Sequence, residues 1–392
     1  MLTHLGLTPT FGFGDRLGLA TPGHIAAVQE TNIAPIFAQQ SVRENARTGR
    51  TPLQVINDAK RAVDKTGWQG PWGADADHLK TLENLPPFVD AGFTFFTVDP
   101  GDFVDNFADS DSLLTLREKF KLSERKEVGW DQLSALYLSH HQVFDFGEFD
   151  DETLLRAEIK YGKAIQHTIK MYHHLLQLKD SFDFEVSVDE TNAPTTPLEH
   201  YFIANELSRA GVQFTSLAPR FIGRFEKGVD YIGDLALLDA EMAKHASVTA
   251  LFGTYKLSLH SGSDKFSVYP LIAKYWRNHF HVKTAGTSYL EALRVLAVVE
   301  PDLFKKIWNL ALEQYPKERA TYHVSAEIES VPNKTDLPVL LDEFNARQIL
   351  HVTFGSALTK YGLELKHALN KHADLYFSFL KSHFSKHLDL LR

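Results

Sequence analysis

Residues 75–78 place two carboxylates and one imidazole within four positions, as Asp75, Asp77 and His78. A carboxylate can accept and return a proton, and an imidazole can ligate a metal ion or exchange a proton near neutral pH. We predict that Asp77 and His78 divide these tasks, with the imidazole as a metal ligand and the carboxylate as a base. Such a pair needs further polar side chains around it.

Polar side chains of the same kinds lie at the ends of other strand-like runs. They are Asp99 and Asp102, then Asp189 and Glu190, then His260 and Asp264, and finally His281 and Lys283. Any one of them could be only a turn former or a helix cap. Their occurrence at five strand ends favours a shared site.

The donor atoms available to a metal ion are nitrogen and oxygen, because the chain has no cysteine. Imidazoles with a carboxylate suit Zn²⁺, Mn²⁺, Co²⁺ or Ni²⁺, and such a site usually leaves positions open for substrate. We predict His78 and His260 as ligands. Glu226 could complete the set, or it could pair with Arg224 or Lys227.

The remaining polar residues at these ends are expected to bind substrate. They are Asp99, Asp264, His281 and Lys283. His281 lies deeper in its strand and could equally be a core histidine, whereas Lys283 suits an anionic group. Paired hydrogen bonds from an arginine are a second way to hold a carboxylate or phosphate. Arg16, Arg43 and Arg220 are candidates, with a surface ion pair as the alternative.

The elements that would position these residues alternate between short apolar runs and helical patterns. The candidate strands are 10–15, 34–41, 71–78, 93–100, 184–191, 213–220, 256–263 and 280–287. Eight strand–helix repeats predict an α/β fold, a closed (β/α)8 TIM barrel of parallel strands. In such a barrel the carboxyl ends of the strands meet at one mouth, where active sites are built.

The C-terminal quarter should add helices to this barrel. We treat 1–392 as a single elaborated barrel domain, with the barrel over about 10–300 and a helical extension over about 301–392. The run 349–356 resembles a ninth strand, but we assign it to the extension. A long helical pair is expected over 111–181, and Ser288 and Glu291 have capping-box spacing. The aromatic run 373–384 could support self-association, although packing within the chain is commoner.

Composition narrows the class of function. The 392 residues are 44% hydrophobic and 23% charged, with a net charge of −9 that disfavours nucleic-acid binding. No stretch approaches the ~18 apolar residues of a membrane span, so we expect a cytoplasmic protein with a small-molecule partner. The run GFGDRLG has the wrong glycine spacing for a dinucleotide fingerprint, so NAD is not expected.

Several long motifs carry a resemblance to a known family. They are FGFGDRLGLATPGH, WGADADHLKT, FTFFTVDPGDF, SVDETNAPTTP, GRFEKGVDYIGD, SLHSGSDKF and HVKTAGTSYLEALR. From about residue 10 to 365 the chain resembles the tagaturonate epimerase family of sugar isomerases. More distantly it resembles the auxiliary subunit of tagatose-bisphosphate aldolase and the metal-dependent class II aldolases.

The resemblance implies a divalent-metal epimerase that interconverts tagaturonate and fructuronate. The inverted carbon carries a hydroxyl β to the ketone, so its C–H is not directly acidified, and retro-aldol cleavage with re-addition would invert it. On this hypothesis Asp77 takes and returns the hydroxyl proton, His78 and His260 hold the metal, and Glu190 is the partner acid or base. An aldolase would supply a histidine where this chain has Glu226.

Two other functions are open at this stage. An aldose–ketose isomerase acting on a neutral sugar would use a similar metal site, but it would not need Lys283 or an arginine for a carboxylate. A non-catalytic barrel that binds sugar or assists an aldolase is the other alternative. It would not require the titratable set of Asp77, His78, Glu190 and His260.

Overall fold

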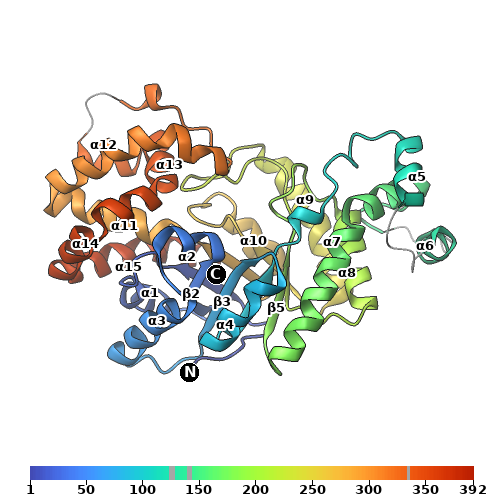
Figure 1. Ribbon diagram of the computed structural model, residues 1–392, viewed down its shortest axis with the longest axis horizontal. Coiled ribbons are helices and arrows are strands. Elements are labelled where there is room, and N and C mark those ends of the chain that lie inside the picture. The colour runs from blue at the N-terminus through green and yellow to red at the C-terminus, as the bar shows by residue number, and fades with distance from the viewer. Residues whose placement is uncertain (123–128, 139–143, 333–335) are drawn as a thin grey trace.

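The computed structural model describes residues 1–122, 129–138, 144–332 and 336–392. Eight parallel strands close into a barrel in chain order, which confirms the predicted TIM barrel (Figure 1). Each predicted strand overlaps an observed one. The strands are β1 Thr10–Gly14, β2 Ala34–Ser41, β3 Gly73–Leu79, β4 Phe95–Val98, β5 Asp183–Ser187, β6 Ser216–Ala218, β7 Lys256–Leu259 and β8 Phe280–Thr284.

The strands are buried on both faces, because helices cover the outside of the barrel and side chains fill its interior. In β3, Ala74 and Ala76 belong to the apolar core, whereas the alternate residues Asp75 and Asp77 contact Lys283 of β8. Period-two alternation therefore aims the carboxylates of β3 into the barrel.

Helices follow the strands and form the outer layer. Those up to the end of β8 are α1 Thr21–Val28, α2 Val42–Thr48, α3 Pro52–Thr66, α4 Leu85–Ala91, α5 Leu113–Leu122, α6 Trp130–Tyr137, α7 Asp151–Leu178, α8 Pro197–Arg209, α9 Leu235–Phe252 and α10 Tyr269–Trp276. Short 3-10 turns lie at η1 Leu82–Asn84 and η2 Gly101–Phe103. The segment 111–181, predicted as a helical pair, contains three helices within the described residues, α5, α6 and α7. Its residues 123–128 and 139–143 lie outside the described ranges.

The C-terminal part is helical, as expected. It contains α11 Thr287–Val299, α12 Pro301–Glu318, η3 Arg319–Thr321, η4 Ile328–Ser330, η5 Leu337–Leu341, α13 Phe344–Val352, α14 Phe354–Lys371 and α15 Ala373–Asp389. In Figure 1 these orange and red helices gather on one side of the barrel, beside the blue helices of the N-terminal segment. The strand-like run 349–356 is helical, and we assigned it to the extension.

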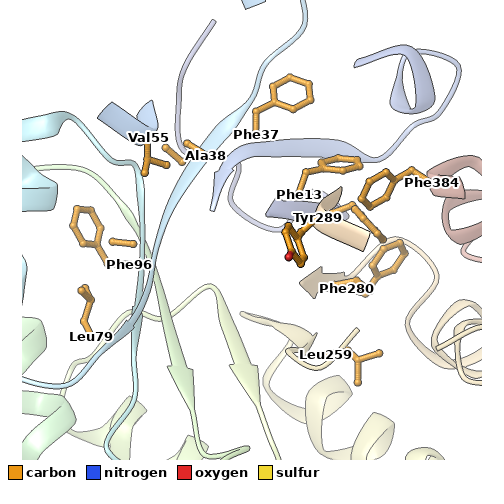
Figure 2. Packing of buried hydrophobic residues seen from close by; sticks show 14 of the residues in the cluster. Phe13, Phe37, Ala38, Val55, Leu79, Phe96, Leu259, Phe280, Tyr289 and Phe384 are labelled. Atoms are coloured by element: carbon orange, nitrogen blue, oxygen red, sulfur yellow. The ribbon is translucent and has the colours of Figure 1, made fainter. Parts of the chain in front are cut away.

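Helix α15 packs into the barrel wall through its apolar face. The ring of Phe384 lies 5.0 Å from that of Phe13 in β1, and Figure 2 shows both close to Tyr289 of α11. Tyr376 and Leu380 are buried too. The aromatic run 373–384 therefore packs within the chain.

The capping box expected at Ser288 and Glu291 is wrong. Helix α11 begins at Thr287 after Gly286, and no side chain caps it. The Ser288 hydroxyl lies 2.8 Å from His24 Nε2, and Glu291 accepts a hydrogen bond from Arg294. The side chains of Ser288 and Glu291 therefore make these contacts and do not cap the helix.

No helix within the described ranges is long and apolar enough to cross a membrane.

Candidate active site

The centre of the site is an ammonium group inside the barrel. Lys283 Nζ lies 2.7 Å from Asp75 Oδ2, 2.8 Å from Asp77 Oδ1 and 2.8 Å from Glu185 Oε1. It also donates to Thr97 Oγ1 at 2.5 Å. Burial disfavours the charged amine, but the three carboxylates raise the pKa of Lys283 above its usual value. Lys283 thus joins strands β3, β4, β5 and β8 below the mouth.

Glu185 also fixes the orientation of His260. His260 Nε2 lies 2.5 Å from Glu185 Oε1. Burial would raise the pKa of Glu185, but Lys283 and His260 hold it well below its usual value. An ionised carboxylate only accepts hydrogen bonds, so His260 Nε2 carries the proton and Nδ1 is the nitrogen left for a ligand.

Asp77 orients His78 in the same way. Asp77 Oδ1 lies 2.8 Å from His78 Nδ1, so the opposite nitrogen, Nε2, faces away. The backbone makes this contact feasible, because His78 has a left-handed φ of 52° and the pairing register of β3 shifts between Ala76 and Leu79. A left-handed conformation is uncommon for a residue with a side chain and often marks a functional site.

The two remaining imidazole nitrogens face one carboxylate. Asp189 Oδ1 is 3.8 Å from His78 Nε2 and 3.3 Å from His260 Nδ1. Glu190 Oε1 is also 3.8 Å from His78 Nε2. Burial would lower the pKa of His78, but Asp77, Glu190 and Asp189 raise it to about 10. These carboxylates form a cluster that stabilises a positive charge on His78.

Asp99 is a further carboxylate close to His78. Its carboxylate is buried, and burial together with Glu190 raises its pKa despite His78 and Lys80. Lys80 Nζ lies 3.5 Å from Asp99 Oδ2 and 2.9 Å from Asp102 Oδ1. Asp99 therefore joins the predicted site at the end of β4.

Three groups of side chains among the described residues could hold a metal ion: one is Asp264, His383 and His387, and the other two overlap at His78. The ligand atoms of Asp77, His78 and His260 lie within 4.8 Å of one another, and so do those of His78, Asp99 and Glu190. These groups contain both predicted histidine ligands. Their carboxylate and imidazole donors fit a divalent ion of the predicted kinds.

A cavity of about 400 Å³ opens beside this cluster. His260, Asp189 and Glu190 line it, together with cationic side chains and residues 321–325 of the extension. A cavity of this size is in the range of small-molecule sites.

The predicted third ligand, Glu226, lines the same cavity but has other partners. Glu226 Oε2 accepts hydrogen bonds from Ser325 Oγ at 2.7 Å and Gln348 Nε2 at 2.7 Å, and Oε1 lies 3.3 Å from Arg224. The alternative pairing with Arg224 is observed.

Asp264 and His281 are placed away from the histidine pair. Asp264 bonds Arg347 at 2.9 Å and His383 at 2.5 Å, and it lines a second cavity. His281 is fully buried inside β8, with Nδ1 2.9 Å from Thr10 Oγ1. Asp264 therefore links the extension to the barrel. His281 fills part of the barrel interior.

The three arginine candidates differ in their surroundings. Arg16 lies 2.8 Å from Glu44 in a buried ion pair, not in the surface ion pair given as the alternative. Arg43 is exposed and lies 3.4 Å from Glu190. Arg220 lines the cavity, and within the described ranges its guanidinium has no ion pair.

Comparisons with known proteins identify the family and agree with the fold. A family model described as tagaturonate epimerase matches residues 3–391. A tagaturonate/fructuronate epimerase from Thermotoga maritima is 46% identical over 398 residues, which cover 98% of this chain and 81% of that protein. The chain belongs to the tagaturonate epimerase family. It is therefore an isomerase, as expected from the resemblance.

Solved structures of this family share the whole fold. A crystal structure of the fructuronate-tagaturonate epimerase UxaE from Cohnella laeviribosi complexed with one glycerol superimposes with a TM-score of 0.95 at 40% identity. The native structure of that epimerase gives 0.94 at 41% identity. Both alignments cover 100% of this chain and 83% of the other.

Sequence reasoning missed one residue that organises the site of this family member. Glu185 was not singled out, although it contacts both Lys283 and His260. The signal was the alternation in 183–189, where Phe184, Val186 and Val188 are apolar and the residues between them are polar. In a barrel strand the polar positions point inward, so Glu185 could have been found.

Proposed function

We propose that this protein interconverts tagaturonate and fructuronate, using a divalent metal ion held by His78, His260 and Asp189. One observation carries the proposal: Asp189 Oδ1 lies within 3.8 Å of the outward nitrogens of both histidines, beside a sugar-sized cavity. Asp189 takes the place that we predicted for Glu226, whose carboxylate is engaged by Ser325 and Gln348. A bound ion would supply Lewis-acid stabilisation of negative charge on substrate oxygens.

The side chains beneath the ligands serve to orient them. Asp77 holds the Nδ1 proton of His78, and Glu185 holds the Nε2 proton of His260. Lys283 fixes both carboxylates. Burial would raise the pKa of Asp77, but His78 and Lys283 hold it well below its usual value. Asp77 Oδ1 is engaged by both His78 and Lys283, so we assign Asp77 to positioning instead of proton transfer.

Glu190 is better placed to exchange a proton with substrate. It lines the cavity, whereas Asp77 does not. Burial would raise the pKa of Glu190, but His78, Arg43 and Lys227 lower it, so the carboxylate is ionised and ready to accept a proton. We assign the hydroxyl proton of the substrate to Glu190.

The reaction that fits these groups is retro-aldol cleavage followed by re-addition. Glu190 removes the proton from the hydroxyl on the carbon to be inverted. The adjacent C–C bond breaks, its electron pair moves into the ketone to give an enediolate, and the other fragment becomes an aldehyde. Rotation of the aldehyde and re-addition on its opposite face, with return of the proton by Glu190, gives the epimer without any external co-reactant.

Cations in the cavity favour a sugar acid over a neutral sugar. Among the cations that line it, Arg220 and Lys227 have no ion pair within the described residues. A site for a neutral sugar would have no use for these two unpaired charges, and an aldose–ketose isomerase is therefore the weaker alternative.

The test is an NMR assay of tagaturonate with purified protein in D₂O. Before the assay, the protein is treated with a chelator and then resupplied with Mn²⁺, Zn²⁺, Co²⁺ or Ni²⁺ in separate samples. We expect fructuronate to form only after metal is restored, with protium retained at the inverted carbon, because its C–H bond is never broken. Deuterium at that carbon would refute the retro-aldol route, and absence of fructuronate in every sample would refute the function.

A further inference from the structure

Of the four cationic side chains that line the cavity, two have a carboxylate partner among the described residues and two have none. Arg43 pairs with Glu190 at 3.4 Å, and Arg224 pairs with Glu226 at 3.3 Å. Within the parts of the chain that the structure describes, neither Arg220 nor Lys227 has an ion pair. The guanidinium of Arg220 has no hydrogen bond there either, and the Lys227 ammonium donates only to Ser261 Oγ, at 3.1 Å.

Both side chains are partly buried, so water does not fully replace the missing partner. Burial lowers the pKa of Arg220, although Asp189 raises it. Removing a cation from water costs free energy unless an anion or hydrogen bonds compensate. A half-buried unpaired cation beside a cavity therefore indicates that an anionic ligand completes it.

The backbone that carries Arg220 is held rigidly. Arg220 follows β6, its N–H donates to Thr195 Oγ1 at 3.1 Å, and its carbonyl accepts from Thr195 N at 2.8 Å. The Arg220 side chain is therefore attached to a fixed backbone position just after the end of β6. Rigid support lowers the entropy lost when a side chain binds its ligand.

The backbone on both sides of Lys227 in the chain is held as well. The carbonyl of Glu226 accepts from Lys265 Nζ at 2.8 Å, and the carbonyl of Gly228 accepts from Arg347 Nε at 2.6 Å. Arg347 belongs to α13, so the helical extension fixes the position of this cation.

We propose that Arg220 and Lys227 bind the carboxylate of the substrate and set the selectivity for sugar acids over neutral sugars. The planar fork of an arginine can hold both carboxylate oxygens, and a lysine adds a second point charge. The inference rests on the proposed function for the identity of the substrate. It adds which residues recognise the acid group.

The test compares binding of tagaturonate with binding of the neutral ketohexose that carries a CH₂OH in place of the carboxylate. Isothermal titration is performed on wild type, Arg220→Met, Arg220→Lys and Lys227→Met. A charge-assisted hydrogen bond of about 1.5–3 kcal/mol corresponds to a loss of roughly 10- to 100-fold in affinity. We expect a loss of that size for the uronate in both Met variants, a smaller loss in Arg220→Lys, and less than about a threefold change for the neutral sugar.

Arg224→Met is the matched control, because Arg224 lines the same cavity but already has a carboxylate partner. Its uronate affinity should change less than about threefold, and thermal unfolding should confirm that all variants are folded. Unchanged uronate affinity in both Met variants, an equal loss in the control, or an equal loss for the neutral sugar would overturn the inference. If the neutral sugar does not bind wild type, the uronate comparison decides.

This experiment separates the inference from the proposed function. Charge-dependent uronate binding without any turnover would leave the carboxylate site standing and remove the epimerase proposal. Epimerisation with unchanged uronate affinity in the two Met variants would support the epimerase proposal and remove the carboxylate site. No measurable uronate binding by wild type would overturn the carboxylate site.

Discussion

Glu185 Oε1 lies 2.5 Å from His260 Nε2 and so determines which nitrogen of that imidazole can meet a ligand. The same oxygen lies 2.8 Å from Lys283 Nζ. Glu185 is therefore a positioning residue: it does not line the cavity, but it orients a side chain that does. Partners of this kind commonly tune ligand geometry and affinity at metal sites.

Replacing Glu185 with Gln should weaken metal binding while keeping the size of the side chain. The amide can no longer hold the protonated Nε2 of His260 as strongly, so metal affinity should fall by about 10- to 100-fold. The measurement is a competitive titration against a chromophoric chelator. Ser258→Ala, a buried change in β7 that touches neither histidine in the described contacts, is the control. Wild-type affinity in Glu185→Gln would contradict the assigned role.

Lys283→Met should destabilise the fold strongly. The substitution leaves Asp75, Asp77 and Glu185 buried together without their shared cation, and breaking a buried ion pair typically costs about 3–5 kcal/mol. Urea unfolding measures the loss. The control is Lys274→Met, because Lys274 pairs with Asp239 at the surface and its loss should leave stability unchanged within error. Equal stability of the two variants would show that the central ammonium is not structural.

Asp264→Ala should loosen the attachment of the helical extension. Asp264 holds Arg347 of α13 and His383 of α15, and its N–H donates to His387 Nε2 at 3.1 Å. Its removal leaves the buried guanidinium of Arg347 unpaired, which should cost about 3–5 kcal/mol. Hydrogen exchange should speed up in α13 and α15 before the barrel strands. Asp342→Ala, at an exposed ion pair with Arg294, is the control; a uniform change over the whole chain would contradict the prediction.

Stability should fall as the pH drops from about 6.5 towards 4. Burial lowers the pKa of His24 to about 4 despite Asp15, and it lowers the pKa of His245 to about 3. Because these folded pKa values lie below the unfolded value of about 6.5, the unfolded chain binds more protons in this window and gains stability relative to the fold. Urea midpoints between pH 7 and 4.5 measure the trend.

The contribution of His24 to the pH dependence of stability can be measured with a single variant. His24 Nε2 lies 2.8 Å from the Ser288 hydroxyl, its ring stacks on Phe13 and meets Phe384 edge-on, and Asp15 is the charged group near it. His24→Gln should flatten the pH dependence relative to wild type. A midpoint that stays constant or rises on acidification, in wild type, would contradict the assignment of neutral buried histidines.

The fold could be predicted from the sequence because barrel strands leave a local signature. Each strand is a short buried run that ends in turn residues, and helical patterns separate the runs. The run 349–356 shows the limit of that signature. Its Ile, Val, Thr and Phe residues resemble a strand, but packing in the extension makes it helical, since β-propensity depends strongly on context.

The site could be predicted only in part. Asp77, His78, Glu190 and His260 were found because they close strands, and the barrel mouth collects strand ends. The partners of Glu226 could not be found this way, since Ser325 and Gln348 lie far along the chain and meet it only after the extension folds. Likewise, the sequence does not show that, among the described residues, Arg224 has an ion pair and Arg220 has none.

The most direct test of the central claim is the metal content of the purified protein and its variants by elemental analysis. The account predicts about one divalent ion per chain in wild type, since a site of this kind holds a single ion. That ion should be lost in His78→Ala, His260→Ala and Asp189→Ala, together with uronate turnover, and retained in Glu226→Gln. Full uronate turnover by metal-free wild type, or undiminished metal in both histidine variants, would contradict it.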